Sequence, residues 1–272
     1  MSRHGGAAAC RAANDQLAAA ILAEDQRAGG KGKGYFAGFG VVDMSDGAEA
    51  AAELRRVVQE LGFVGVLIDN RSPGGKFYDG VEYEGWWEAV EEVGVPVYLH
   101  PSWVGEEEMG RYEGNFGDAA ARSLASSGWG WHSKTGMHVL RLFAAGVFDR
   151  WPGVKIVIGH MGEMIPFMLE RIKVLSRRWG TFRRDFGTVY DENIWITTSG
   201  VWSLDPMRCI LANTRLDHIL YSVDYPFQTN EAGLAWMREL EESGLVDEEQ
   251  LKAIAYGNAE KLLGVKLPDR EV

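Results

Sequence analysis

Six short runs of apolar, β-favouring residues recur along the sequence, and helical patterns separate them. The runs are almost continuously hydrophobic, as expected of strands buried on both faces. They cover residues 35–44, 63–69, 95–100, 154–160, 193–200 and 218–224. Strands that alternate with helices predict a parallel sheet. With 272 residues, the chain has a normal length for a (β/α)₈ barrel.

The segments between these runs have helical spacing of their apolar residues. Helices are predicted over 11–22, 47–62, 85–94, 135–152, 163–179, 231–244 and 247–264. Residues 109–133 are rich in glycine and aromatic residues, which is typical of a loop that closes over a ligand. No linker or shift in composition divides the chain, so residues 1–272 are predicted to form a single domain.

Composition and net charge indicate which kinds of binding partner the protein does not have. The apolar fraction of 46% is ample for a large core, and the net charge of −11 argues against nucleic acid and acidic membrane surfaces. The two cysteines, Cys10 and Cys209, provide neither a disulfide framework nor a CxxC zinc motif. No apolar run approaches the ~20 residues needed to span a bilayer. We therefore expect a reduced, cytoplasmic setting.

Three of the predicted strands end in side chains that can bind a metal or move a proton. They are His100 in "VPVYLHP", His160 in "KIVIGHMGE" and Asp224 in "LYSVDYPF". A parallel barrel gathers the carboxyl ends of its strands at one mouth, so these groups should meet there. Imidazole nitrogen and carboxylate oxygen together suit Zn²⁺ or Mn²⁺. The alternative is that each histidine is structural and that Asp224 caps the next helix.

Two residues after the fourth run have both a structural and a functional interpretation. Glu163 falls in the first turn of a predicted helix, where a carboxylate favours the dipole, or it orients His160 and shares a proton with it. Arg171 lies about two turns further on. It is either a solvated surface residue or a guanidinium that holds a substrate carboxylate bidentately.

The remaining histidines carry weaker signals. His132, in "GWGWHS", either lines a pocket or lies in a surface loop, and the surface loop is the prediction. His138 is predicted to be structural on its helix. His4 and His218 have no functional pattern. Asp69 ends the second run and Asn70 follows it, and either turn chemistry or a place in the site explains these two residues.

Several blocks of sequence resemble the amidohydrolase superfamily, and more narrowly its decarboxylase branch. The blocks are "PVYLHP", "GVFDRWPGVKIVIGHMGEMIPFMLERI", "ITTSG" and "ILYSVDYPF". The branch includes 2,3-dihydroxybenzoate and γ-resorcylate (2,6-dihydroxybenzoate) decarboxylases, with aminocarboxymuconate semialdehyde decarboxylase as a more distant member. The resemblance implies a TIM-type (β/α)₈ barrel with one divalent metal, and dimers or tetramers of one chain.

The resemblance also implies roles for individual residues. His100 and Asp224 match the metal ligands of strands five and eight, and His160 matches a catalytic group partnered by Glu163. Arg171 matches a position associated with substrate recognition or with the adjoining subunit. The family's first-strand metal motif has no counterpart here. The six runs correspond to strands three to eight, so the barrel is expected to be truncated at its N-terminus.

The resemblance thus implies metal-dependent, non-oxidative decarboxylation of an ortho-hydroxylated benzoic acid by a carboxy-lyase. Asp224 would donate the proton to the substrate ring, while the side chains of Trp103 and Phe227 would pack against that ring. Two alternatives remain open at this point. One is a metal-dependent amide or lactone hydrolase with nearly the same ligands, and the other is an inactive, truncated barrel.

Overall fold

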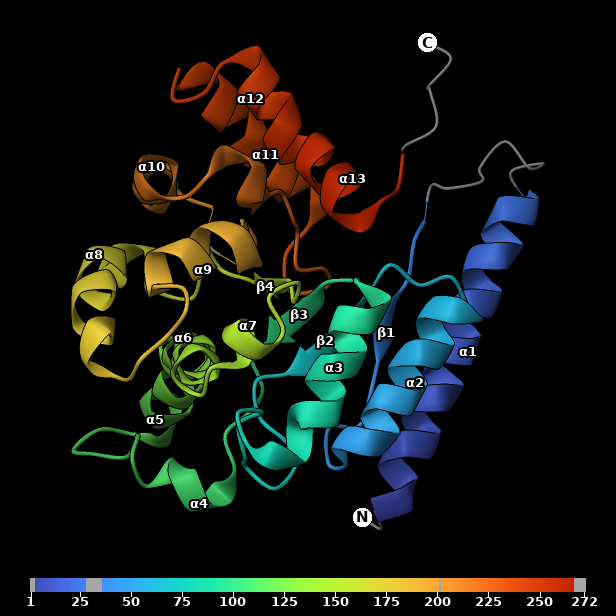
Figure 1. Ribbon diagram of the computed structural model, residues 1–272. Helices are drawn as coiled ribbons and strands as arrows, with labels where there is room; N and C mark the ends of the chain where they lie inside the picture. The colour runs from blue at the N-terminus through green and yellow to red at the C-terminus, as the bar shows by residue number, and fades with distance from the viewer. Residues whose placement is uncertain (1–2, 28–35, 201, 267–272) are drawn as a thin grey trace.

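The structure is a computed structural model that describes residues 3–27, 36–200 and 202–266. Its centre is one six-stranded sheet in which every neighbouring pair is parallel and the strands follow chain order (Figure 1). The strands are β1 (Phe39–Val41), β2 (Gly65–Asp69), β3 (Val97–His100), β4 (Ile156–Ile158), β5 (Ile194–Thr197) and β6 (Ile219–Leu220). The prediction of an α/β fold with a parallel sheet is confirmed, and the sheet is consistent with a TIM-type barrel. Each strand is shorter than its apolar run, because only part of each run pairs with a neighbouring strand.

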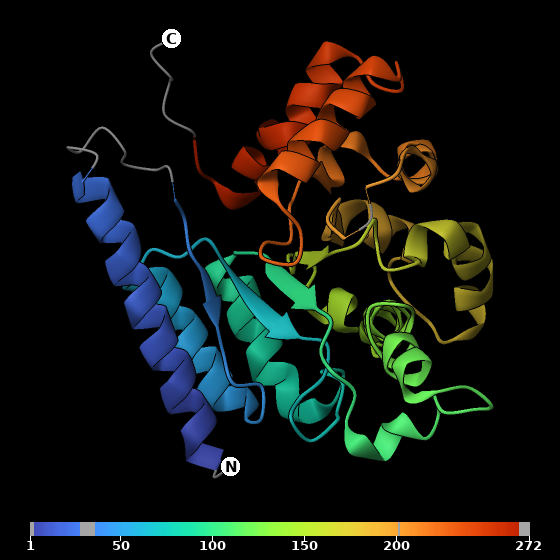
Figure 2. The same cartoon turned by 180° about the vertical axis from the view of Figure 1, so that it is seen from behind.

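Helices cover the outer face of this sheet. α1 lies beside α2, and α2 lies beside α3, while α11–α13 gather beyond β6 (Figures 1 and 2). The helices are α1 (Arg3–Arg27), α2 (Gly47–Gln59), α3 (Glu84–Val93), α4 (Glu106–Met109), α5 (Asp118–Ala125), α6 (Gly130–Ala144), α7 (Val147–Arg150), α8 (Ile165–Leu175), α9 (Phe186–Asn193), α10 (Leu204–Asn213), α11 (Asn230–Glu242), α12 (Glu248–Lys252) and α13 (Asn258–Leu263). Within the described residues, none of them is long and apolar enough to cross a bilayer.

Several helix boundaries differ from the prediction. The predicted helix at 135–152 begins earlier, at Gly130, and is divided into α6 and α7 by Gly146, whose φ of +72° breaks the helix. The predicted loop at 109–133 therefore contains α5 and the start of α6. α9 and α10 were not predicted. The predicted helix at 247–264 is interrupted by a π-helical turn (Ala253–Gly257), which leaves the Ile254 carbonyl to accept the Tyr221 N–H at 2.9 Å.

The strand register determines which side chains face the inside of the curved sheet. Tyr98 pairs with Leu67 and with Val157, while His100 pairs with Asp69. Successive residues alternate between faces, so Tyr98 and His100 lie on the same inner face as their partners. The other residues of the strands face the helices and pack against them to form the main core. Its fully buried side chains include Leu54 of α2, Trp86 and Trp87 of α3, and the strand residues Ile68, Leu99, Ile156 and Ile158.

The outer edge of β1 is occupied by a side chain of α1. The Asn14 amide donates to the Val41 carbonyl at 2.9 Å, and its oxygen accepts the Val41 N–H at 2.9 Å. One buried amide side chain thus makes the two hydrogen bonds that a neighbouring strand would make there. Strand edges with unpaired N–H and C=O groups are otherwise prone to pair with another chain.

His138 on α6 is structural, as predicted. It is fully buried, its Nε2 accepts the Tyr78 N–H at 2.9 Å, and its Nδ1 donates to the Asn70 carbonyl at 2.7 Å. The Asn70 side chain donates in turn to Thr135 Oγ1 at 2.8 Å. Asn70 therefore anchors the segment after β2 to α6. The backbone bonds require neutral His138, and burial lowers its pKa to about 4.

We predict that His138 makes the protein less stable in mild acid. Because its pKa is lowered from an ordinary value of 6.5 to about 4, the unfolded chain binds this proton first. The free energy of unfolding should fall by up to about 1.4 kcal/mol per pH unit between those two values. Urea unfolding of His138→Gln, whose amide can replace both hydrogen bonds, should show a smaller fall. If the free energy of unfolding fell equally with pH in both proteins, His138 would not be the cause of the acid sensitivity.

Candidate active site

The three predicted strand-end residues meet at one mouth of the sheet. His100 is the last residue of β3, while His160 follows β4 and Asp224 follows β6 after short loops. The ring centroids of His100 and His160 lie 6.3 Å apart, and His160 Nε2 lies 4.0 Å from Asp224 Oδ2. The sheet therefore brings two imidazoles and one carboxylate within reach of a single small ligand.

A left-handed turn holds His160 and Glu163 side by side. Every residue from His160 to Met164 has a positive φ, at 53°, 57°, 92°, 51° and 68° in order, although only Gly162 lacks a side chain. Such conformations cost of order 1–3 kcal/mol per residue and cluster at functional sites. The turn is held by the Gly162 N–H, which donates to the Gly159 carbonyl at 2.8 Å. Glu163 therefore precedes α8, and the prediction that it lies in the first turn of that helix was wrong.

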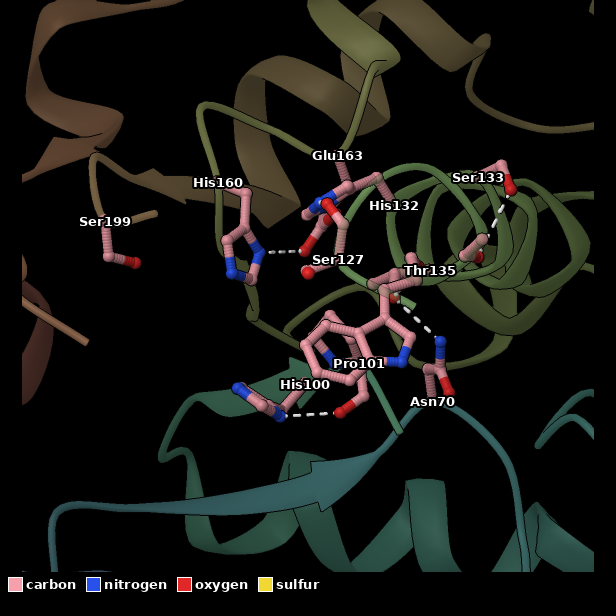
Figure 3. Close-up of polar contacts among 12 residues, drawn as sticks. Asn70, His100, Pro101, Ser127, His132, Ser133, Thr135, His160, Glu163 and Ser199 are labelled. Carbon is pink, nitrogen blue, oxygen red and sulfur yellow. Dashed lines mark hydrogen bonds and ion pairs between the residues drawn. The ribbon is translucent and has the colours of Figure 1, made fainter. Parts of the chain in front are cut away.

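Glu163 is a buried carboxylate shared between two imidazoles. Its Oε1 lies 2.6 Å from His160 Nδ1, and its Oε2 lies 2.7 Å from His132 Nδ1, while the side chain is 0% exposed (Figure 3). The prediction that His132 lies in a surface loop was wrong, because α6 begins at Gly130 and carries His132 in its first turn, where it faces the left-handed turn. The predicted pairing of Glu163 with His160 is present.

Burial and charge shift the pKa of several groups around the mouth. Burial alone would lower the pKa of His132, but the hydrogen bond that it donates to Glu163 and the charge of that carboxylate outweigh burial and raise the pKa. Burial raises the pKa of Tyr98 to about 12, so its phenol stays protonated and pairs with Thr197 Oγ1 at 2.9 Å. Burial also raises the pKa of Asp69, against the lowering effect of the His100 charge. The strand register places Asp69 beside His100 at the mouth.

The hydrogen bonds decide which nitrogens are free to bind a metal. His100 Nδ1 donates to the Pro101 carbonyl at 2.7 Å, which leaves Nε2 with a lone pair, as in metal-binding histidines (Figure 3). His160 Nε2 is also free, because Nδ1 is bonded to Glu163. Both nitrogens of His132 are engaged, since Nε2 lies 2.9 Å from the Ser127 carbonyl. The donor atoms of His132, His160 and Glu163 lie within 4.8 Å of one another and could hold an ion, but hydrogen bonds alone explain their spacing.

The other predicted binding residues are exposed. Arg171 lies on the solvent side of α8, while Trp103 and Phe227 are 70% and 76% exposed. The Trp103 ring packs edge-on against Trp131, with centroids 5.0 Å apart. Trp103 also lines a surface pocket with residues of α4 and α5. The binding roles of Arg171, Trp103 and Phe227 therefore stay predictions.

The lack of a side chain at Gly200 allows the His160 ring to lie against the backbone of that residue. A Cβ at Gly200 would lie 2.3 Å from His160 Cδ2, and its φ is +85°. We expect Gly200→Ala to displace the ring and to lower activity about 10²-fold, as small misplacements of a catalytic group do. Gly94→Ala is the matched control, because its φ is +69° with nothing within 4 Å of a Cβ. Steady-state kinetics of both variants would test this, and equal activities would contradict it.

Comparison with known proteins identifies what the chain resembles. The model of the amidohydrolase family matches residues 4–265. Decarboxylase orsB of Emericella nidulans is 52% identical over 266 residues, which cover 96% of this chain and 78% of that protein. The structure of 2,6-dihydroxybenzoate decarboxylase with 2,6-dihydroxybenzoate has a TM-score of 0.81 and 30% identity, covering 94% of this chain and 76% of that one.

A second solved structure contains a metal. It is a dihydroxybenzoic acid decarboxylase from Polaromonas sp. JS666 with bound manganese and the inhibitor 2-nitroresorcinol. Its TM-score is 0.80 at 33% identity, and the match covers 94% of this chain and 74% of that one. The resemblance to the decarboxylase branch, inferred from the sequence blocks, is confirmed by these matches.

Proposed function

Because the chain belongs to the amidohydrolase family and its relatives include hydroxybenzoate decarboxylases, we propose that it removes CO₂ non-oxidatively from an ortho-hydroxylated benzoic acid. The observation that carries this proposal is the convergence of His100, the His160–Glu163 pair and Asp224 at one mouth. A carboxylate that can deliver a proton and an imidazole that can receive one lie within 4.0 Å there.

His100 Nε2 and Asp224 would hold the divalent metal, Zn²⁺ or Mn²⁺. The fit rests on the Pro101 carbonyl, which fixes the Nδ1 proton of His100 and frees the other nitrogen. When bound, the metal would supply positive charge that attracts the substrate's carboxylate and phenolate oxygens and stabilises developing negative charge. The manganese bound to the Polaromonas decarboxylase supports this choice of ions.

Asp224 would donate a proton to the ring carbon that bears the carboxylate. The carbon–carbon bond then breaks, its electron pair restores the aromatic ring, and CO₂ leaves. Each turnover consumes one proton, and solvent then supplies a new proton to Asp224. His160, held at Nδ1 by Glu163, faces Asp224 with Nε2 and would receive and return protons at that atom.

The binding roles of the exposed residues fit an assembly of several chains. Phe167 and Val174 on α8 are 84% and 56% exposed, and Arg171 lies on the same helix. We propose that the protein works as a homodimer or homotetramer in which Arg171 serves an adjoining subunit. The side chains of Trp103 and Phe227 would pack against the substrate ring.

A substrate panel tests the proposed function. The protein, loaded with Mn²⁺ or Zn²⁺, is incubated with 2,6-dihydroxybenzoate and other dihydroxybenzoates, and CO₂ release is measured. Benzoate, which lacks the ortho hydroxyl, is the matched negative substrate, and a series of lactones tests the hydrolase alternative. We expect CO₂ only from ortho-hydroxylated acids. Lactone hydrolysis without CO₂ release would identify a hydrolase, and turnover of neither class would favour the inactive barrel.

A further inference from the structure

His132 is bonded through both ring nitrogens. Its Nε2 lies 2.9 Å from the Ser127 carbonyl, which can only accept, so this nitrogen carries a proton. Its Nδ1 lies 2.7 Å from Glu163 Oε2, and a contact this short between two acceptors is not stable without a proton between them. The ring is therefore fixed at both ends, and its orientation is not free to change.

The same argument applies to the other oxygen of Glu163. His160 Nδ1 lies 2.6 Å from Oε1, so a second proton lies in that contact. His132, Glu163 and His160 together thus hold one proton more than two neutral imidazoles and a carboxylate would. The carboxylate is 0% exposed, so water does not replace either partner. If His132 were absent, Glu163 would keep one partner and could rotate.

The turn between α5 and α6 holds the Ser127 carbonyl in place. The Gly128 N–H donates to the Ser123 carbonyl at 2.9 Å, and the Trp131 N–H donates to the Ser126 carbonyl at 3.1 Å. A Cβ at Gly128 would lie 2.7 Å from the Ser123 carbonyl oxygen, and one at Gly130 would lie 2.5 Å from that of Ala125. The glycines of "GWG" therefore permit a tight turn that directs one carbonyl at His132.

We propose that His132 is a positioning residue for the proposed decarboxylation. Held by the Ser127 carbonyl, it fixes the Glu163 carboxylate, which in turn holds His160 with Nε2 directed at Asp224. His132 does not itself face the reacting atoms. This inference rests on the proposed function for its catalytic consequence, but the hydrogen bonds it invokes can be measured without turnover.

The kinetic test uses three variants. His132→Phe keeps a ring of similar size but removes both hydrogen bonds, and we expect kcat to fall about 10²-fold with little change in KM. His132→Gln, which can still donate to Glu163, should recover about tenfold of that loss. His218→Gln is the control, because His218 donates to the Ile194 carbonyl away from the site. A His132→Phe variant with unchanged kcat would overturn the proposal.

A spectroscopic test separates this proposal from the proposed function. In protein labelled with ¹⁵N-histidine, the Nδ1 protons of His132 and His160 should give signals downfield of the amide region. We expect His132→Phe to shift or broaden the His160 signal, whether or not the protein turns over a hydroxybenzoate. An unchanged His160 signal would overturn the proposal. Loss of the His132 signal on adding one equivalent of Zn²⁺ would overturn it too, in favour of metal ligation.

Discussion

Replacing Asp224 by Asn should lower kcat about 10³-fold, within the range by which general acids contribute to catalysis. The amide has nearly the same size as the carboxylate but cannot deliver a proton to the ring carbon. The backbone should not change, because Asp224 has a φ of +67° and Asn tolerates this left-handed region as Asp does. The loss should therefore come from chemistry and from weaker metal binding, not from misfolding.

Two measurements separate these causes. Metal content per chain, measured by elemental analysis, reports how far binding is weakened, and kcat at saturating Mn²⁺ reports the chemical step. Asp205→Asn is the matched control, because its side chain is 90% exposed and pairs only with Arg208 among the described ion pairs. If Asp224→Asn retained more than about a tenth of wild-type kcat at saturating metal, the assignment of Asp224 as proton donor would be wrong.

Replacing Glu163 by Gln should have the second largest effect. An amide offers one acceptor where the carboxylate offers two, so one of the two imidazole protons loses its partner. We expect kcat to fall about 10²-fold as His160 loses its fixed orientation. Leaving a buried donor unsatisfied should also lower the free energy of unfolding by about 1–3 kcal/mol.

The control for the Glu163 variant is the same substitution at Glu170 on α8, the helix that follows Glu163. Glu170 is exposed and pairs with Lys173 at 3.0 Å, so Glu170→Gln should change neither kcat nor stability by much. Kinetics and urea unfolding of the two variants give both readouts. A Glu163→Gln variant that lost stability but kept full kcat would show that the carboxylate is structural only.

The strands and the strand-end residues could be predicted from the sequence because their signals are local. A strand buried on both faces needs an almost unbroken apolar run, and a polar residue at its end is placed by the topology alone. His100, His160 and Asp224 come together for this reason. The exact strand ends could not be predicted, because pairing depends on the neighbouring strand.

The parts that were missed depend on contacts distant in sequence or on unusual backbone. α10 contains Pro206 in its first turn, where the missing N–H is tolerated, although proline further along a helix would break it. α9 was missed because it runs into β5 with no glycine or proline between them. The left-handed turn at His160 contradicts the preference of every residue in it except Gly162.

His132 was missed because Glu163, its partner, lies 31 residues further along the chain. A signal was present, however. The helical spacing of Thr135 and His138 continues back to Trp131, and a helix that begins there places His132 in its first turn, near the strand ends. The glycines of the preceding segment had favoured a loop instead.

Isotope incorporation during turnover tests the central claim most directly. The Mn²⁺-loaded protein is incubated with 2,6-dihydroxybenzoate in D₂O, and CO₂ and the aromatic product are analysed by mass spectrometry and NMR. We predict release of CO₂ with one deuterium on the ring carbon that carried the carboxylate, and loss of both in Asp224→Asn. No CO₂ from the wild-type protein, or undiminished labelled product from Asp224→Asn, would contradict the account.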